Sequence, residues 1–163
     1  MTYDAQLMKK IGIDIFSGAG GLSLGGAMAG IKVRYAIEVN PHAAKSFELN
    51  HKGAKVICGD IRDVKATDFL NKDEEVFIIM GGPPCQGFSM SNTMSRNMDN
   101  PNNLLFKEFV RLVSEIKPRW FVLENVWGMT KMNNGETIEM IKHCFEEIEP
   151  GYKVKWKVLW ADE

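Results

Sequence analysis

The sequence holds few of the residues from which metal sites and disulfide frameworks are built. Only three of its 163 residues are cysteine and three are histidine, and their spacing matches neither a disulfide framework nor a metal-ligand motif. No apolar run has the length of a membrane span, and residues 1–10 form no secretory signal. We therefore expect a protein of a reducing, cytoplasmic compartment, with no bound metal and no membrane contact.

The sequence also lacks an excess of either charge. Lysine and arginine number 20 against 21 aspartate and glutamate residues, which gives a formal net charge of −1 at pH 7. No overall basic field indicates a nucleic-acid partner, unless the basic surface lies elsewhere. Internal repeats and low-complexity stretches are absent as well. The length is enough for one domain with a real core, so we expect residues 1–163 to form a single domain.

Apolar segments of strand length alternate with segments of helical periodicity. Strands are expected at residues 11–16, 31–37, 54–57, 76–80 and 120–123, and the alternating segment 152–160 should add another. Helices are expected at residues 22–29, 41–50, 63–70, 104–116 and 136–148, and Asn40 and Pro41 are a good cap and first residue for the second of these. The alternation predicts an α/β fold of three layers, with helices on both faces of a mostly parallel sheet.

Polar or reactive residues follow every one of the first five expected strands. A glycine-rich turn follows the first strand, Glu38 the second, Asp60 the third, Cys85 the fourth and Glu124 the fifth. In parallel sheets, ligands bind beyond the carboxyl ends of the strands. Packing alone does not explain five such ends, so we expect one functional site there.

The first three strand ends favour an adenosyl ligand. In the turn, Gly18 and Gly20 are followed by Ser23, where a dinucleotide fingerprint would have its third glycine. Glu38 can accept hydrogen bonds from both hydroxyls of a ribose, and Asp60 can accept one from an adenine amino group. Each feature has an alternative. The glycine residues could form only a close strand-to-helix turn, Glu38 could simply precede a helix N-terminus, where negative charge is favoured, and the sequence around Asp60 could be a turn.

The last two strand ends carry a thiol and a carboxylate. Cys85 lies in the sequence GGPPCQGFS of residues 81–89, where paired prolines and glycines stiffen the turn. Glu124 ends an apolar strand, and burial there would favour its protonated form, which can donate to a ring nitrogen. The alternatives are a buried structural cysteine and a solvated strand-end acid. No histidine lies close to Cys85 in the sequence, which argues against a Cys-His hydrolase.

These motifs together resemble the N-terminal part of a DNA (cytosine-5)-methyltransferase, and the resemblance covers nearly the whole chain. The matching segments are residues 13–21 (IDIFSGAGG), Glu38, residues 59–61 (GDI), residues 82–89 (GPPCQGFS), residues 103–106 (NLLF) and residues 124–126 (ENV). The resemblance implies a Rossmann-like methyltransferase fold, truncated at its C-terminal end, in the interior of a bacterial or phage-infected cell.

The resemblance also implies S-adenosyl-L-methionine as methyl donor and S-adenosyl-L-homocysteine as product. The implied donor-binding residues are Phe16, Gly18, Gly20, Leu22, Glu38, Asp60, Ile61, Pro83 and Leu105. One departure concerns Val39, because many relatives carry an aromatic residue at this position that stacks on the adenine.

The implied reaction is methylation of cytosine C5 in double-stranded DNA. Cys85 would add to C6 of the ring, and Glu124 would contact N3 and the exocyclic amine. The base must leave the double helix first. Implied DNA contacts are Gln86, Ser89, Arg96 and Asn125, and the polar loop 89–103 has the length of a lid, although a solvated loop is an equal alternative.

Family members continue with an arginine-bearing strand, a target-recognition region and a final helix. The resemblance therefore implies that residues 1–163 form an incomplete core, which needs a missing C-terminal half or a second polypeptide. The fifth strand would then have an open edge and could self-associate. Alternatives are a non-catalytic adenosyl-binding or assembly fragment, an RNA-modifying relative and, more distantly, a nicotinamide oxidoreductase.

Overall fold

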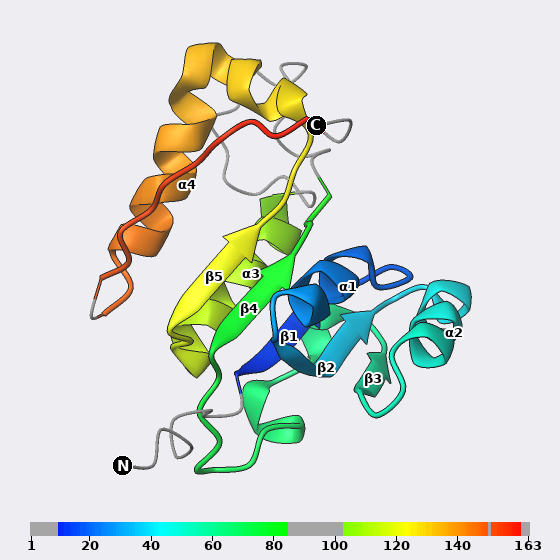
Figure 1. The fold of residues 1–163 in the computed structure, drawn as a ribbon. Coiled ribbons are helices and arrows are strands. Elements are labelled where there is room, and N and C mark those ends of the chain that lie inside the picture. The colour runs from blue at the N-terminus through cyan, green and yellow to red at the C-terminus, as the bar shows by residue number, and fades with distance from the viewer. Residues whose placement is uncertain (1–9, 85–102, 150, 161–163) are drawn as a thin grey trace, which may run out of the picture.

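Five parallel strands form one sheet at the centre of the molecule (Figure 1). The computed structural model describes residues 10–84, 103–149 and 151–160. The strands are β1 (Ile11–Ile15), β2 (Lys32–Glu38), β3 (Lys55–Cys58), β4 (Ile78–Gly81) and β5 (Trp120–Leu123), in the spatial order β3-β2-β1-β4-β5. All four pairings are parallel, which confirms the predicted sheet and its five strands.

Helices cover the sheet on both faces, as predicted. They are α1 (Gly21–Met28), α2 (Pro41–Asn50), α3 (Asn103–Ile116) and α4 (Glu136–Glu146). In Figure 1, α1 lies in front of the sheet and α3 behind it. Because side chains alternate along a strand, Ile79 points into the core that α3 closes, whereas Met80 contacts α1 at Gly26, whose missing side chain leaves room for it.

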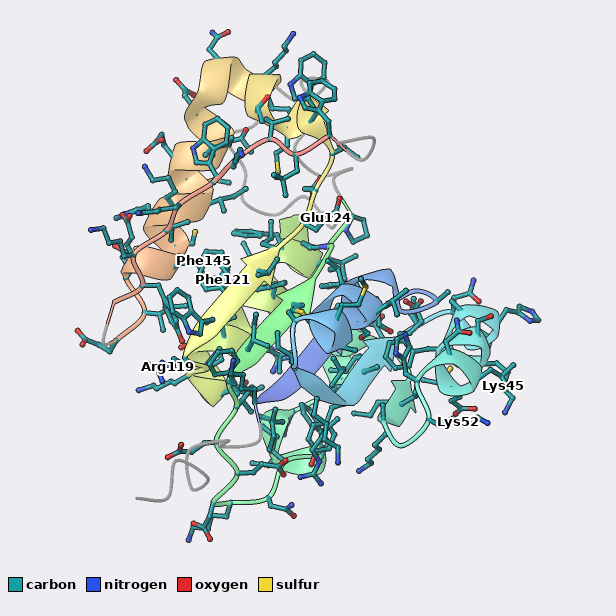
Figure 2. All side chains as sticks on the ribbon, in the orientation of Figure 1. Lys45, Lys52, Arg119, Phe121, Glu124 and Phe145 are labelled. Atoms are coloured by element: carbon teal, nitrogen blue, oxygen red, sulfur yellow. The ribbon has the colours of Figure 1, made fainter. Side chains whose placement is uncertain are left out.

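The core behind the sheet is rich in aromatic rings. Phe106 and Phe109 of α3 and Phe145 of α4 are buried, and Phe145 stacks on Phe121 of β5 with ring centroids 4.1 Å apart (Figure 2). Aromatic pairs of this kind contribute about 0.5–1.5 kcal/mol beyond the apolar area that they bury. They attach α4 to the edge strand β5.

Two expected elements are absent from the described part of the chain. Residues 63–70 form no α-helix, because the segment folds into the short 3₁₀ turns η2 (Ile61–Asp63) and η3 (Ala66–Asp68). Residues 152–160 form no strand and instead run along α4 (Figure 1). Tyr152 anchors that segment, since its hydroxyl donates to the Pro118 carbonyl at 2.6 Å and its ring meets Phe121 edge-on.

Strand β5 forms one edge of the sheet, and its face on the α1 side is uncovered among the described residues. Trp120 is 57% exposed and Val122 is 43% exposed, although both belong to an apolar strand. A 3₁₀-helical segment, η6 (Trp127–Gly135), leads from β5 to α4. Among the described helices, none is long and apolar enough to cross a membrane.

Candidate functional site

A cavity of about 430 Å³ opens at the carboxyl ends of the strands. Its lining combines predicted donor-binding residues (Phe16, Glu38, Asp60, Ile61, Leu105) with residues that sequence reasoning did not assign to donor binding (Ile37, Val39, Gly59, Arg62, Gly82, Pro84). Segments far apart in the sequence meet here because parallel strands bring all their carboxyl ends to one side. The cavity therefore lies where the sequence placed the functional site.

The glycine turn and Glu38 are joined by hydrogen bonds. The Gly18 N–H donates to Glu38 Oε2 at 2.8 Å, and the Asn40 N–H donates to Oε1 at 2.8 Å. A carboxylate has about four acceptor positions, so each oxygen keeps capacity for a ligand hydroxyl. Phe16 has φ = 59°, a left-handed conformation that is uncommon for a side chain of this size and typical of constrained functional turns.

The far side of the glycine turn is held by the end of α2. Gly20 has φ = 97°, and its carbonyl lies 2.9 Å from His51 Nε2; a Cβ at Gly20 would overlap the His51 ring. Asn50 donates to the Ala19 carbonyl at 3.1 Å. His51 is half-buried, because its ring packs between the turn and Phe47.

Four predicted donor-binding residues do not line the cavity. Gly20 lies within the turn, Leu22 lies on α1, and Pro83 is buried while its neighbours Gly82 and Pro84 form the lining. Gly18, also off the lining, reaches the site through its bond to Glu38.

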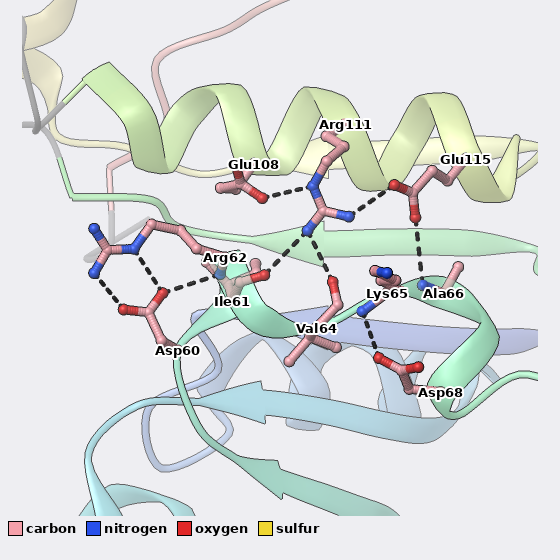
Figure 3. Close-up of polar contacts among 10 residues, drawn as sticks. All are labelled: Asp60, Ile61, Arg62, Val64, Lys65, Ala66, Asp68, Glu108, Arg111 and Glu115. Atoms are coloured by element: carbon pink, nitrogen blue, oxygen red, sulfur yellow. Dashed lines mark hydrogen bonds and ion pairs between the residues drawn. The ribbon is translucent and has the colours of Figure 1, made fainter. Parts of the chain in front are cut away.

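Asp60 has a partner that the sequence analysis missed. Its Oδ1 accepts hydrogen bonds from the backbone N–H and the Nε of Arg62, both at 2.9 Å, and its Oδ2 pairs with Arg62 Nη2 (Figure 3). These bonds lower the pKa of Asp60 to about 2. The carboxylate is therefore ionised and serves as an acceptor only, which suits an amino group. The two residues are only two positions apart, a spacing that could have indicated the pair.

A second carboxylate, Asp14, lies fully buried beneath the glycine turn. Burial raises its pKa to about 6, although hydrogen bonds from Ser23 oppose the shift. The Ser23 hydroxyl donates to Asp14 Oδ2 at 2.6 Å, whereas Oδ1 has no partner in the described part of the chain. Ser23, which breaks the dinucleotide fingerprint, is thus the partner of Asp14.

The ends of β4 and β5 are tied together. The Glu124 N–H donates to the Gly81 carbonyl at 2.9 Å, and Asn125 Nδ2 donates to the Pro83 carbonyl at 2.9 Å. A Cβ at Gly82 would lie 2.7 Å from Glu124 Oε2, so a side chain there would require the Glu124 carboxylate to shift. Glu124 is exposed, not enclosed as expected, and it lies just past Leu123, the last paired residue of the edge strand β5 (Figure 2).

The remaining predicted site residues lie outside the described residues. They are Cys85, Gln86, Ser89 and Arg96, together with the loop up to residue 102. The described backbone leads to Cys85 through Pro84, which lines the cavity. No cluster of histidine, cysteine and acidic side chains that could hold a metal is found where the structure is described.

Two curated proteins that are similar to this chain in sequence are type II methyltransferases. The chain is 42% identical to the type II methyltransferase M1.HphI of Haemophilus parahaemolyticus, a match that covers 91% of this chain and 40% of that protein. It is 39% identical to the type II methyltransferase M.FnuDI of Fusobacterium nucleatum, over 91% of this chain and 41% of that protein. The chain thus spans about 40% of the length of these curated relatives.

Solved structures agree with the fold. A prophage-encoded Escherichia coli protein, assigned as a DNA modification methyltransferase, matches with a TM-score of 0.68 at 36% identity, over 82% of this chain and 37% of that one. The Dnmt2 methyltransferase of Schizosaccharomyces pombe matches in fold with a TM-score of 0.60 at 23% identity, over 83% of this chain and 40% of that one. The profile of one family, described as C-5 cytosine-specific DNA methylase, matches residues 11–163. The chain therefore belongs to the C-5 cytosine-specific DNA methylase family.

Proposed function

We propose that this chain carries the donor-binding and catalytic core of an enzyme that methylates cytosine C5 in double-stranded DNA. The donor would be S-adenosyl-L-methionine and the product S-adenosyl-L-homocysteine. The observation that carries the proposal is the cavity, whose two carboxylates, Glu38 and Asp60, adjoin the Gly82–Pro84 turn that leads to Cys85. Family membership supports the same reaction.

The described residues fit the proposed donor. Glu38 is already oriented by two backbone N–H groups and has capacity for two ribose hydroxyls. Asp60 is ionised and can accept from the adenine amino group. Phe16, Ile61 and Leu105 supply apolar surface for the ring. The donor contributes an electrophilic methyl group.

Cys85 would supply the activation that cytosine C5 lacks. Its thiolate would form a bond to C6, and the ring electron pair displaced by this addition would make C5 nucleophilic. Glu124 would stabilise the charge that develops at N3 and the exocyclic amine. After methyl transfer the C5 proton leaves, the electron pair of that bond re-forms the ring double bond, and the C6–S bond breaks to release the thiolate.

The proposed DNA contacts are residues that follow the Gly82–Pro84 turn in the sequence or bond to it. Gln86, Ser89 and Arg96 follow Cys85 in the sequence, and the Asn125 side chain is held at the Gly82–Pro84 turn by its hydrogen bond to the Pro83 carbonyl. The target base would be turned out of the helix to meet the thiol.

Trapping of a covalent adduct tests this proposal. A duplex with 5-fluorocytosine at the target position cannot lose the C5 substituent as a proton, so the enzyme should remain attached in the presence of S-adenosyl-L-methionine. We expect an adduct with the wild-type protein, none with Cys85→Ser and much less with Glu124→Gln. Donor binding without any adduct, even with the C-terminal part supplied, would favour the alternative of a non-catalytic adenosyl-binding or assembly fragment.

We also propose that residues 1–163 form one domain that is incomplete by itself. The chain spans about 40% of its curated relatives, and strand β5 has an open edge in the described sheet. A C-terminal half, or a second polypeptide, would add the target-recognition region and cover this edge. A second copy of the chain would compete for the same edge.

A further inference from the structure

One wall of the cavity is built from a segment with little regular structure of its own. Asp60, Ile61 and Arg62 line the cavity, and the chain from Asp60 to Asp68 contains only the two 3₁₀ turns η2 and η3. Such short turns have few internal hydrogen bonds and poor bond geometry. The position of this wall therefore depends on contacts from elsewhere in the fold.

Arg111 of α3 supplies those contacts. Its Nη2 donates to the Ile61 carbonyl at 3.0 Å and to the Val64 carbonyl at 2.9 Å, so one nitrogen spans the whole η2 turn (Figure 3). Ile61 and Val64 are both buried. Without Arg111, each of these carbonyls would lose a hydrogen-bond donor in a place that water reaches poorly.

Two glutamates hold the Arg111 guanidinium in place. Its Nε donates to Glu108 at 2.6 Å and its Nη1 to Glu115 at 2.8 Å. Glu115 in turn accepts from the Ala66 N–H at 3.3 Å, at the start of η3. The fork of a guanidinium can make these four bonds at once, whereas the point charge of a lysine cannot reproduce their directions.

The same helix also forms another part of the cavity. Leu105, six residues before Arg111 on α3, lines the cavity directly. Helix α3 thus contributes one wall through Leu105 and fixes the Asp60–Arg62 wall through Arg111. We propose that Arg111 is a positioning residue for the methyl donor, which sets the separation of these two walls at the adenosyl end of the site. This inference rests on the proposed function.

If Arg111 has this role, its substitution should reduce the affinity for the donor more than it reduces the stability of the fold. We expect Arg111→Met to weaken S-adenosyl-L-homocysteine binding to the full protein by about 10-fold, a loss of about 1.4 kcal/mol, in isothermal titration. The loss should appear in KM for S-adenosyl-L-methionine more than in kcat. Adenosine alone should lose affinity by a similar factor, because the wall lies at the adenosyl end. Arg111→Lys should restore little of the affinity.

Arg34→Met is the matched control. Arg34 also pairs with a shielded carboxylate, since Arg34 Nη1 lies 2.6 Å from Glu74, but neither residue lines the cavity. We expect this variant to lose stability against urea and to bind S-adenosyl-L-homocysteine normally. Should Arg111→Met fold poorly, Glu115→Gln loosens the guanidinium without removing it and should still weaken binding.

The outcomes separate the two proposals. Equal affinities for wild type, Arg111→Met and Glu115→Gln would overturn the positioning role while the proposed function stands. Equal losses in Arg111→Met and Arg34→Met would also overturn it, since the effect would then be general destabilisation. A wild-type protein that binds no S-adenosyl-L-homocysteine would overturn the proposed function, and the inference with it.

Discussion

At the residue scale, the buried Asp14 should make stability depend on pH. Its folded pKa of about 6 exceeds the ordinary value of 3.8, so the folded state binds the proton more tightly than the unfolded state. The contribution of Asp14 to stability is therefore greatest below about pH 4 and falls as the pH rises through 6, by about 3 kcal/mol in total. Asp14→Asn should remove this fall, measured as the free energy of unfolding in urea between pH 4 and 7. The exposed Asp73→Asn is the control, and parallel pH curves for Asp14→Asn and wild type would contradict the prediction.

Substitution of Gly82 should lower the rate of DNA methylation more than it lowers the stability of the fold. An added Cβ would lie 2.7 Å from Glu124 Oε2, so Gly82→Ala must displace that carboxylate. Displacements near 1 Å at a reacting centre can cost about 100-fold in rate, and we expect a loss of at least about 10-fold in DNA methylation. Gly128→Ala, where an added Cβ meets nothing within 4 Å, should leave the rate unchanged. Equal rates for wild type and Gly82→Ala would contradict the proposed role of Glu124.

At the element scale, the start of α2 allows a test of stability. Asn40 Oδ1 accepts hydrogen bonds from the backbone N–H groups of His42 at 2.9 Å and Ala43 at 3.2 Å. Asn40→Ala removes both and should cost about 1 kcal/mol in the free energy of unfolding, whereas Asn40→Asp keeps the acceptor and should cost little. Urea unfolding measures the difference. An alanine variant as stable as wild type would mean that solvent satisfies these groups equally well.

Elements set by local sequence signals could be predicted, whereas elements set by distant contacts could not. The Asn40-Pro41 start of α2 was predictable because a cap and a first-turn proline are local signals, and β5 was predictable because it is an apolar run between Pro118 and a polar end. The η2 and η3 turns were not predictable, since Arg111 bonds to η2 and Glu115 bonds to η3 across about 50 residues of sequence. His51 was likewise unpredictable, because its partner Gly20 lies 31 residues away. Contacts of this kind depend on the assembled sheet.

At the scale of the whole molecule, the uncovered face of β5 should promote association. Trp120 and Val122 are exposed beside an open sheet edge, and such edges pair with other chains. We expect residues 1–163, produced alone, to increase in mean mass with concentration in light scattering, and Val122→Lys to reduce this. Leu24→Lys on α1, which replaces another exposed apolar residue, should not. A monomer at all concentrations would contradict self-association through this edge.

The cavity lining spans the chain from Phe16 to Leu105 and draws on the ends of four strands and on α3. A ligand that binds there should therefore favour states in which all of these segments are folded over states in which any of them has opened. By mass action, saturation at 100 times Kd would deepen the folded free-energy minimum by about 2.7 kcal/mol. Hydrogen exchange should then slow in β3 at one edge of the sheet as well as in β4 beside the turn, even though no residue of β3 itself lines the cavity.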